Sequence, residues 1–340
     1  MPLDEVARCL IQHGCTDISN DLDLSNCSQD AVARGGFGAV YRGLLKSGQP
    51  IAIKCVEVLG QWGVSDESHK VLRRAAKELY AWTRSSHPGV LNLFGFARFR
   101  GQIALVSPWM SNGSLGSYLA RTIDINYRIQ LCIQITQALE HLHSSGVVHG
   151  DIKPDNIMLS DNHQVQLADF GSAVLTGDFS LGFTPTDPKF TLRFASPELL
   201  GGTSEHTTKT DIYALSMTIL SILTGKRPFP NKRDHAIVAE VLIHKNRPPL
   251  SDFPIFAGRD RLWGLLERCW AHTPEDRPTA TEVSHALIEV ERGVYEPWTG
   301  PCSRNILDYA SSSEDWSDSL IVLIDASVFF FFFLLSILGV

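Results

Sequence analysis

The feature that most constrains this chain is one polar segment near its middle, set among apolar residues. It runs from Val148 to Leu159 and reads VHGDIKPDNIML, and Asp169-Phe170-Gly171 follows it. Transfer of a phosphoryl group requires oxygen ligands for metal ions, a carboxylate near the accepting hydroxyl, and positive charge for the developing negative charge. The segment supplies these groups as Asp151, Asn156, Asp169 and Lys153. Such a cluster in a loop is by itself more often a solvated turn, so this interpretation needs support from elsewhere in the chain.

A lysine and a glutamate upstream are candidates for the same site. Lys54 lies in an otherwise apolar strand predicted over 51–56. Burying an unpaired ammonium group is costly, so Lys54 needs a phosphate or a carboxylate as partner. Glu78, within a helix predicted over 66–84, is the candidate carboxylate. The alternative is that the side chain of Lys54 extends along the surface and keeps its charge in water.

A glycine-rich turn precedes this lysine. Residues 33–41 read ARGGFGAVY, which predicts a strand, a turn and a second strand. Small residues at such a turn let backbone N–H groups come close to phosphate oxygens. A glycine-rich hairpin is more often only a turn, so this segment alone is weak support for nucleotide binding.

Together and in this order, the segments resemble the protein kinase family: a glycine-rich loop, a strand lysine, a helix glutamate, HxDxKxxN and DFG. Ser196-Pro197-Glu198 stands where the family has its APE motif, and Arg277 matches the arginine that pairs with the glutamate of that motif. The resemblance implies that this pair supports folding and not the chemistry. It also argues against a small-molecule kinase of the same fold.

The resemblance covers about residues 28–293 and implies an α+β, bilobal fold. The small β-rich N-lobe, with one helix, would span 28–109, and the larger α-rich C-lobe would span 110–293. Local patterns agree, because strand-like runs come first and helices follow. One helix is expected between an N-cap at Asp124 and Gly146, and another over 208–224 before Gly225.

The resemblance assigns a catalytic role to each matching residue. Lys54, held by Glu78, would bind the α- and β-phosphates of ATP. Asp151 would accept the proton of the substrate hydroxyl, and Lys153 would stabilise the charge of the γ-phosphoryl group. Asp211 would brace the loop that carries them.

The nucleotide and its metal ions would be held by a further set of residues. Asn156 and Asp169 would bind two Mg²⁺ ions. Ser107 would be a small gatekeeper, and the backbone of Pro108 and Met110 would bond the edge of the adenine. The ATP-binding residues implied are Ala33, Gly35, Gly36, Phe37, Gly38, Val40, Ala52, Lys54, Ser107, Pro108, Met110 and Met158.

Two residues indicate the class of substrate. Lys153 resembles the lysine of serine/threonine kinases, and Thr191 matches the threonine that packs against the catalytic aspartate and lysine in those enzymes. Segments 87–91 and 113–115 resemble the tyrosine-kinase-like branch, some members of which also modify tyrosine. The expected partners are ATP and proteins with serine or threonine. Nucleic acid is not expected, because a formal charge of -7 disfavours polyanions.

Gly150 is the clearest departure from the family pattern, because it replaces the arginine of the HRD motif. In the family that arginine binds a phosphate on the activation segment, which here spans 169–198. We therefore expect the segment to become active without phosphorylation of Thr176, Ser180, Thr184 or Thr186. The alternative is an ATP-binding pseudokinase scaffold tethered to a membrane, motivated by Gly150 and by Ala33 in place of the first loop glycine.

Segments outside this domain differ in character. Residues 1–27 read as a polar lead-in with a short helix over 4–11, and 294–319 as an acidic flexible linker. The seven cysteines form no CxxC pair, which indicates reduced thiols in the cytosol. Residues 320–340 are mostly apolar and match the roughly 20 residues that span a bilayer. This predicts a cytoplasmic kinase domain with a tail anchor in an intracellular membrane.

Two alternatives to the membrane anchor stay open. Asp325 is costly inside a bilayer unless it lies near the interface, and no basic residues flank the segment. The run from Phe329 to Phe333 is unusual and could reflect how the reading frame was defined.

Overall fold

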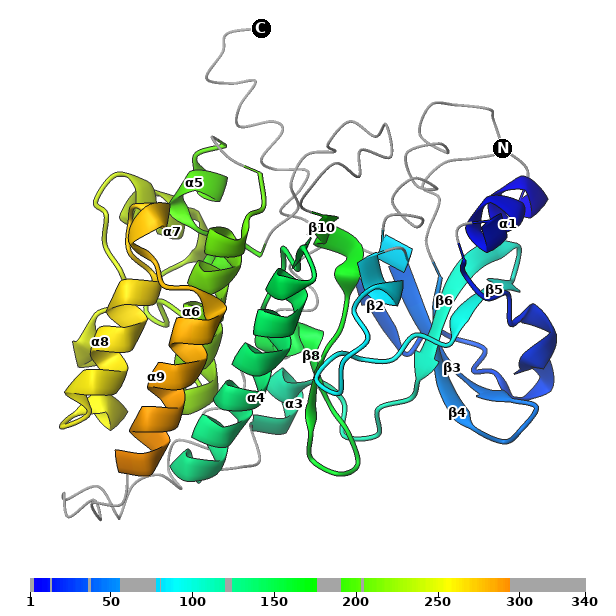
Figure 1. Cartoon of the computed structure of the whole chain (residues 1–340), viewed down its shortest axis with the longest axis horizontal. Coiled ribbons are helices and arrows are strands. Elements are labelled where there is room, and N and C mark those ends of the chain that lie inside the picture. Colours follow the sequence, from blue (N-terminus) through cyan, green and yellow to red (C-terminus); the bar gives the residue numbers. More distant parts are fainter. Residues whose placement is uncertain are drawn as a thin grey trace, which may run out of the picture.

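The computed structural model describes residues 3–12, 14–35, 38–55, 78–79, 81–119, 124–175, 191–202 and 205–293. They form a β-rich lobe, which holds the amino-terminal elements, beside a larger helical lobe (Figure 1). The predicted α+β, bilobal fold is confirmed. The predicted segments 294–319 and 320–340 lie outside the described residues.

One antiparallel sheet forms the smaller lobe. Its strands in spatial order are β1 (Leu22–Asp23), β3 (Gly38–Leu45), β4 (Pro50–Cys55), β6 (Gln102–Pro108) and β5 (Gly95–Phe99), and β2 (Ala33–Gly35) pairs with β3. Successive side chains of a strand point to opposite faces. In β4, Ile51, Ile53 and Cys55 join an apolar cluster on one face. Lys54 therefore points to the other face, where it meets Glu78.

The segment before β2 joins the two edges of this sheet. α1 (Leu3–Gln12) buries Ala7 and Leu10 on one helical face. The backbone of Phe96 in β5 then bonds the backbone of Thr16 and Ile18, each at 2.9 Å, and β1 pairs with the end of β3. Since β5 and the β2–β3 hairpin lie at opposite edges, residues 16–23 connect both. The sequence analysis predicted the short helix but not these contacts.

α6 (Thr208–Thr224) is the central helix of the larger lobe. Every residue from Thr210 to Leu223 is buried, and Gly225 ends the helix at a φ of 68°. These are the bounds that the sequence predicted. α4 (Ile125–Ser144) packs against both α6 and α9 (Ala280–Gly293). Asp124 caps α4 as predicted, because its side chain accepts a hydrogen bond from the backbone of Asn126. The other helices are α3 (Leu115–Leu119), α5 (Pro197–Leu200), α7 (Asp234–Leu242) and α8 (Asp260–Cys269).

Two short pairs of strands bring the chemistry-bearing loops together. β8 (Ile157–Leu159) pairs with β9 (Val165–Leu167), and β7 (Val147–Val148) pairs with β10 (Val174–Leu175). The loop between β7 and β8 and the loop between β9 and β10 are therefore held side by side. The first carries Asp151 and the second carries Asp169.

Two general features concern the part of the chain that the structure describes. No helix there combines the length and the apolar character needed to cross a membrane. The cysteine side chains described there, at positions 15, 27, 55, 132 and 269, are not joined in disulfides.

Candidate active site

The ammonium group of Lys54 lies between two carboxylates. Its Nζ atom is 2.7 Å from Glu78 Oε1 and 2.7 Å from Asp169 Oδ1. β4 supplies the lysine, a helical stretch at 78–79 and 81–83 supplies the glutamate, and the loop after β9 supplies the aspartate. Burial by itself lowers the pKa of Lys54, but the charges of Asp169 and Glu78 outweigh burial and raise that pKa above its ordinary value. The lysine is therefore a fixed positive charge.

Asp169 has a left-handed backbone, with φ 63° and ψ 76°. This conformation is uncommon for residues other than glycine. Its Oδ1 atom also accepts a hydrogen bond from the backbone N–H of Gly171 at 3.3 Å. Burial by itself raises the pKa of Asp169, but the charge of Lys54 holds it below the ordinary value. The carboxylate is therefore ionised.

Three side chains converge on the carboxylate of Asp151, which is 6% exposed. Lys153 Nζ and Asn156 Nδ2 each lie 2.8 Å from Asp151 Oδ2. The hydroxyl of Thr191 donates to Asp151 Oδ1 at 2.9 Å and accepts from Lys153 Nζ at 2.7 Å. Thr191 thus joins the two predicted catalytic residues of this loop from the far end of the activation segment.

Asp211, at the start of α6, holds the backbone of the loop that carries Asp151. Its carboxylate accepts hydrogen bonds from the backbone N–H of His149 at 2.8 Å and of Gly150 at 2.9 Å. His143 Nε2, from the last turn of α4, lies 3.0 Å from the same carboxylate. Burial by itself raises the pKa of Asp211, but the hydrogen bond from His143 contributes to a net lowering. The buried helix α6 thereby fixes the backbone that carries Asp151.

A chain of rings connects this loop with the segment that carries Glu78. His149 Nε2 lies 3.0 Å from the backbone carbonyl of Ala168. The ring of His149 lies 5.2 Å from that of Phe170, and the Phe170 ring stacks on Trp82 at 5.7 Å. Trp82 lies one helical turn after Glu78. The position of Glu78 is therefore coupled by packing to the loop of Asp151 and to that of Asp169.

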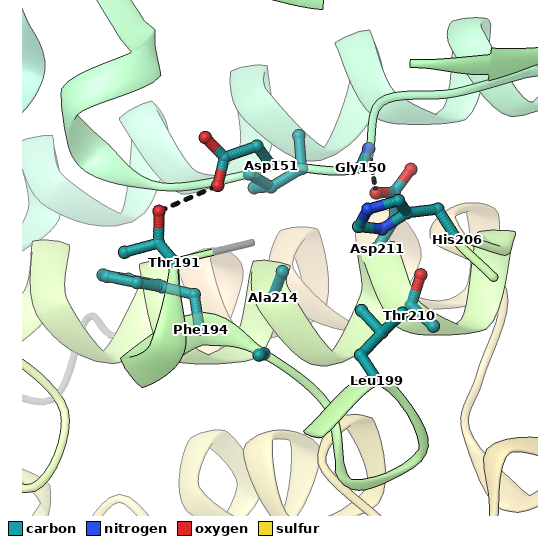
Figure 2. A pocket seen from close by; sticks show the side chains of 11 residues that line it. Gly150, Asp151, Thr191, Phe194, Leu199, His206, Thr210, Asp211 and Ala214 are labelled. Atoms are coloured by element: carbon teal, nitrogen blue, oxygen red, sulfur yellow. Dashed lines mark hydrogen bonds between the residues drawn. The ribbon is translucent and has the colours of Figure 1, made fainter. Parts of the chain in front are cut away.

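Gly150 lies where a side chain does not fit. Its φ is +79°, and a Cβ atom there would lie 2.5 Å from the backbone oxygen of Ser172. Figure 2 shows the small cavity beside it, between the loop of Asp151, the turn of Thr191 and the start of α6. Its volume is ≈ 10 Å³, which is about the space of one water molecule. Among the described residues that line it, none is a lysine or an arginine.

The other predicted ATP-binding residues lie at defined places in the sheet and after it. Val40 pairs with Lys54, and Ala52 pairs with Ser107, so they lie on the adjacent strands β3, β4 and β6. Pro108 ends β6, Met110 is 9% exposed just beyond it, and Met158 lies on β8. Ala33 and Gly35 lie on β2 and Gly38 on β3. Gly36 and Phe37 lie outside the described residues.

The predicted metal ligands fit Mg²⁺ by their chemistry. The amide nitrogen of Asn156 donates to Asp151, which leaves its amide oxygen as the free acceptor. Asp169 offers a second carboxylate oxygen, Oδ2, besides the Oδ1 atom that lies 2.7 Å from Lys54. Mg²⁺ prefers such hard oxygen ligands and keeps several waters, so one or two side chains suffice. These two residues would hold the metal ions that accompany a nucleotide.

The sequence analysis missed several residues that build this site. The link from Trp82 through Phe170 to His149 and the hydrogen bond from His143 to Asp211 have no local signal, because the partners lie far apart in the chain. His149 and Phe170 stand inside recognised motifs, which was the only available pointer. Arg193, which anchors the turn of Thr191, was not singled out.

Comparisons with known proteins agree with the family resemblance of the motifs. The family model described as protein kinase domain matches residues 28–287. A putative L-type lectin-domain containing receptor kinase I.4 of Arabidopsis thaliana is 34% identical over 279 residues, which are 76% of this chain and 40% of that protein. A probable serine/threonine-protein kinase of Dictyostelium discoideum is 30% identical over 262 residues, or 76% of this chain and 27% of that protein.

A third relative is the serine/threonine-protein kinase PknK of Mycobacterium tuberculosis. It is 30% identical over 271 residues, which cover 77% of this chain and 23% of PknK. The chain therefore spans less than half the length of these relatives.

Proposed function

The chain belongs to the protein kinase family, and we propose that it is an active enzyme that transfers the γ-phosphoryl group of ATP to serine and threonine hydroxyls of proteins. The observation that supports activity most strongly is the simultaneous pairing of Lys54 with Glu78 and Asp169, each at 2.7 Å. It brings one positive charge and one ionised carboxylate to the place where the family binds phosphates and metal ions.

The chain's own residues account for each requirement of the reaction. ATP with Mg²⁺, when bound, supplies the phosphoryl group and part of the charge neutralisation. Lys54 would orient the phosphates, and Asn156 and Asp169 would hold the metal ions. Asp151 accepts the proton of the attacking hydroxyl, and Lys153, 2.8 Å from it, places a positive charge beside the transferred group. Catalysis then consists of positioning and electrostatic stabilisation.

Thr191 supports serine and threonine as acceptors. Its hydroxyl bonds both Asp151 and Lys153, the two residues that the acceptor hydroxyl must approach in the proposed reaction. The two residues named from the sequence, Lys153 and Thr191, and the serine/threonine-protein kinases among the relatives support the same class. Tyrosine as an additional acceptor is an outcome of the test below.

The test compares the full chain with Asp151→Asn in transfer of labelled phosphate from ATP and Mg²⁺ to a generic protein. Removal of a general base is expected to lower kcat by about 10²- to 10⁴-fold, with ATP binding retained. Asp161→Asn, at an exposed turn after β8, is the matched control and should keep wild-type activity. Acid hydrolysis of the product should yield phosphoserine and phosphothreonine. A folded wild type that binds ATP but transfers no phosphate would instead identify a pseudokinase scaffold.

We also propose that activity does not require phosphorylation of the activation segment. The support is the environment of Gly150, where the cavity beside it is small and none of the described residues lining it is lysine or arginine. A phosphate would therefore find no cationic anchor at that place. Phosphatase-treated and untreated protein should have the same kcat. A rise of more than about ten-fold on phosphorylation of Thr176, Ser180, Thr184 or Thr186 would contradict the proposal.

We also propose that residues 320–340 anchor the protein in an intracellular membrane, because they form a mostly apolar segment. A fluorescent fusion to the amino terminus should mark membranes for the full chain and the cytosol after truncation at residue 319. Diffuse fluorescence of both would reject the anchor.

A further inference from the structure

Arg193 is a buried arginine in the last part of the activation segment. It lies in the 3-10 turn η5 (Leu192–Phe194), directly after Thr191 and Leu192, and its side chain is 9% exposed. A buried guanidinium group is costly unless its N–H donors are satisfied. Its partners therefore show what the residue holds in place.

The acceptors of Arg193 lie in the loop between α6 and α7 and at the first residue of α7, Asp234. Nη1 donates to the backbone carbonyls of Pro228 at 2.7 Å and Phe229 at 2.8 Å. Nη2 donates to the carbonyl of Lys232 at 2.8 Å and lies 2.5 Å from the carboxylate of Asp234. Asp234 is 67% exposed, so solvent weakens this ion pair, whereas the bonds to the carbonyls of Pro228 and Phe229 are buried. The fork of Arg193 thus ties η5 to the loop of residues 228–234.

This loop is shaped to receive the guanidinium group. Phe229 has a φ of 54°, an uncommon left-handed conformation for a residue with a side chain. Its ring is buried with Ile237 and Val241 of α7, and Leu192 and Leu200 pack against this cluster. The apolar cluster fixes the loop, so the carbonyls of the loop form a rigid acceptor for Arg193.

Arg193 is two residues from the hydroxyl that organises the catalytic loop. Thr191 donates to Asp151 at 2.9 Å and accepts from Lys153 at 2.7 Å, so a shift of η5 would break both bonds. Burial by itself lowers the pKa of Arg193, and the charge of Asp234 opposes this. Arginine stays charged even with a lowered pKa, so the anchor persists at all physiological pH values.

We propose that Arg193 is a positioning residue for phosphoryl transfer, which anchors the turn of Thr191 on the loop between α6 and α7 and so holds Asp151 and Lys153 in register. In this chain the anchor is made of backbone carbonyls, and it stands in place of a phosphate bound by an arginine at position 150. This inference rests on the proposed kinase activity.

The test replaces Arg193 by Met, which keeps much of the volume and removes all donors. We expect kcat for a protein substrate to fall by about 100-fold, because small misplacements of reacting groups have effects of this size. The KM for ATP should not change, since Lys54, Glu78 and Asp169 bind the nucleotide elsewhere. Arg193→Lys should restore part of the activity, because its ammonium reaches some of the carbonyls. Arg193→Met with wild-type kcat would overturn the proposal.

A matched control separates positioning from general stability. Arg247 also donates to backbone carbonyls, those of Trp270 at 2.8 Å and Asn246 at 2.9 Å, but makes no contact with η5. Arg247→Met should lower the thermal midpoint and leave kcat of the folded protein within about two-fold of wild type. Equal losses of kcat in Arg247→Met and Arg193→Met would show that Arg193 is only a structural residue.

The coupling between Arg193 and Thr191 can be measured directly. If Arg193 acts through Thr191, the double variant Thr191→Ala/Arg193→Met should have the same kcat as Thr191→Ala alone. Multiplicative losses would overturn this route. Amide exchange gives a readout without activity: Arg193→Lys should raise exchange at residues 191–195 and 228–234. Unchanged exchange in Arg193→Lys would reject the anchor. Raised exchange in Arg193→Lys, together with a wild type that transfers no phosphate, would support the anchor and reject the proposed activity.

Discussion

Gly150 has two properties that disfavour a side chain at this position. Its φ of +79° is unfavourable for any side chain, and its missing Cβ leaves room for the backbone oxygen of Ser172. The close approach of Ser172 lets the loop of Asp169 lie against the loop of Asp151. Glycine at this position is therefore more than the loss of an arginine, because it allows the close approach of Ser172 just beyond the strand pair β7–β10.

We expect Gly150→Ala to destabilise the protein by about 3 kcal/mol or more, through both the left-handed backbone and the contact with Ser172. Gly48→Ala is the matched control, since Gly48 has a φ of +86° and nothing within 4 Å of its virtual Cβ. That substitution should cost only about 1–2 kcal/mol. Urea unfolding of both variants measures the difference. Equal losses of stability in the two variants would mean that the contact between Gly150 and Ser172 adds nothing to the cost of the left-handed backbone.

At the scale of elements, the ion pair of Glu198 and Arg277 joins α5 to the segment before α9. Arg277 Nη1 and Nη2 lie 2.7 Å and 2.8 Å from the two oxygens of Glu198. The side chain of Arg277 is fully buried, and its Nη1 also donates to the carbonyl of Lys209 at 2.9 Å. The pair therefore connects the end of the activation segment with the start of α6 and with the loop before α9. The predicted pairing of these two residues is confirmed.

The stability contributed by Glu198 should depend on pH. Burial by itself raises its pKa, but the hydrogen bonds and the charge of Arg277 lower it below the ordinary value of 4.5. A depressed pKa in the folded state means that the contribution is present above pH 4.5 and is lost as the pH falls through the folded pKa. Glu198→Gln should therefore cost about 3–5 kcal/mol at pH 7 and less in acid.

Denaturant unfolding of wild type and Glu198→Gln across the acid range measures this difference. Glu289, an exposed residue of α9, is the control, and its substitution by Gln should have little effect at any pH. A cost for Glu198→Gln that stays constant down to the lowest pH would contradict the linkage.

At the scale of the whole molecule, one apolar cluster extends from α1 to the helices of the larger lobe. It includes Ala7 and Leu10 of α1, Leu79 and Trp82 beside Glu78, and Phe170 next to Asp169. The helical stretch of Glu78 therefore shares one apolar core with the amino-terminal segment and with the catalytic loops. The amino-terminal segment supports the position of Glu78 although it contains no predicted site residue.

Two leucines of this segment offer a matched test. Leu10 is 2% exposed and Leu24 is 65% exposed. Leu10→Ala should cost about 2–5 kcal/mol, because a cavity forms in the shared cluster, whereas Leu24→Ala should change stability by less than about 0.5 kcal/mol. Leu10→Ala should also increase amide exchange at residues 79–82. Exchange confined to α1 would show that the segment does not support the stretch of Glu78.

Elements with a local cause were predictable from the sequence. α6 has the predicted bounds because its caps, Thr207 and Gly225, stand at the ends of a continuous apolar run. α4 begins after Asp124 for the same kind of reason. Lys54 could be assigned a buried partner, because a charge inside an apolar strand requires one. The pairing of Lys54 with Glu78 needs only that strand and the helix beside it.

The contacts of Arg193, Thr191 and residues 16–18 could not be predicted in the same way. Their partners are backbone carbonyls or side chains in distant segments, and a carbonyl oxygen has no signature in the sequence. The sequence by itself determined the two-lobed fold and the residues that carry the chemistry, through the resemblance of its ordered motifs to the protein kinase family, and the hydrophobic period and the helix caps agree with that fold. Only the tertiary structure decided which of them meet and what holds them in place, because that depends on packing between segments far apart in the chain.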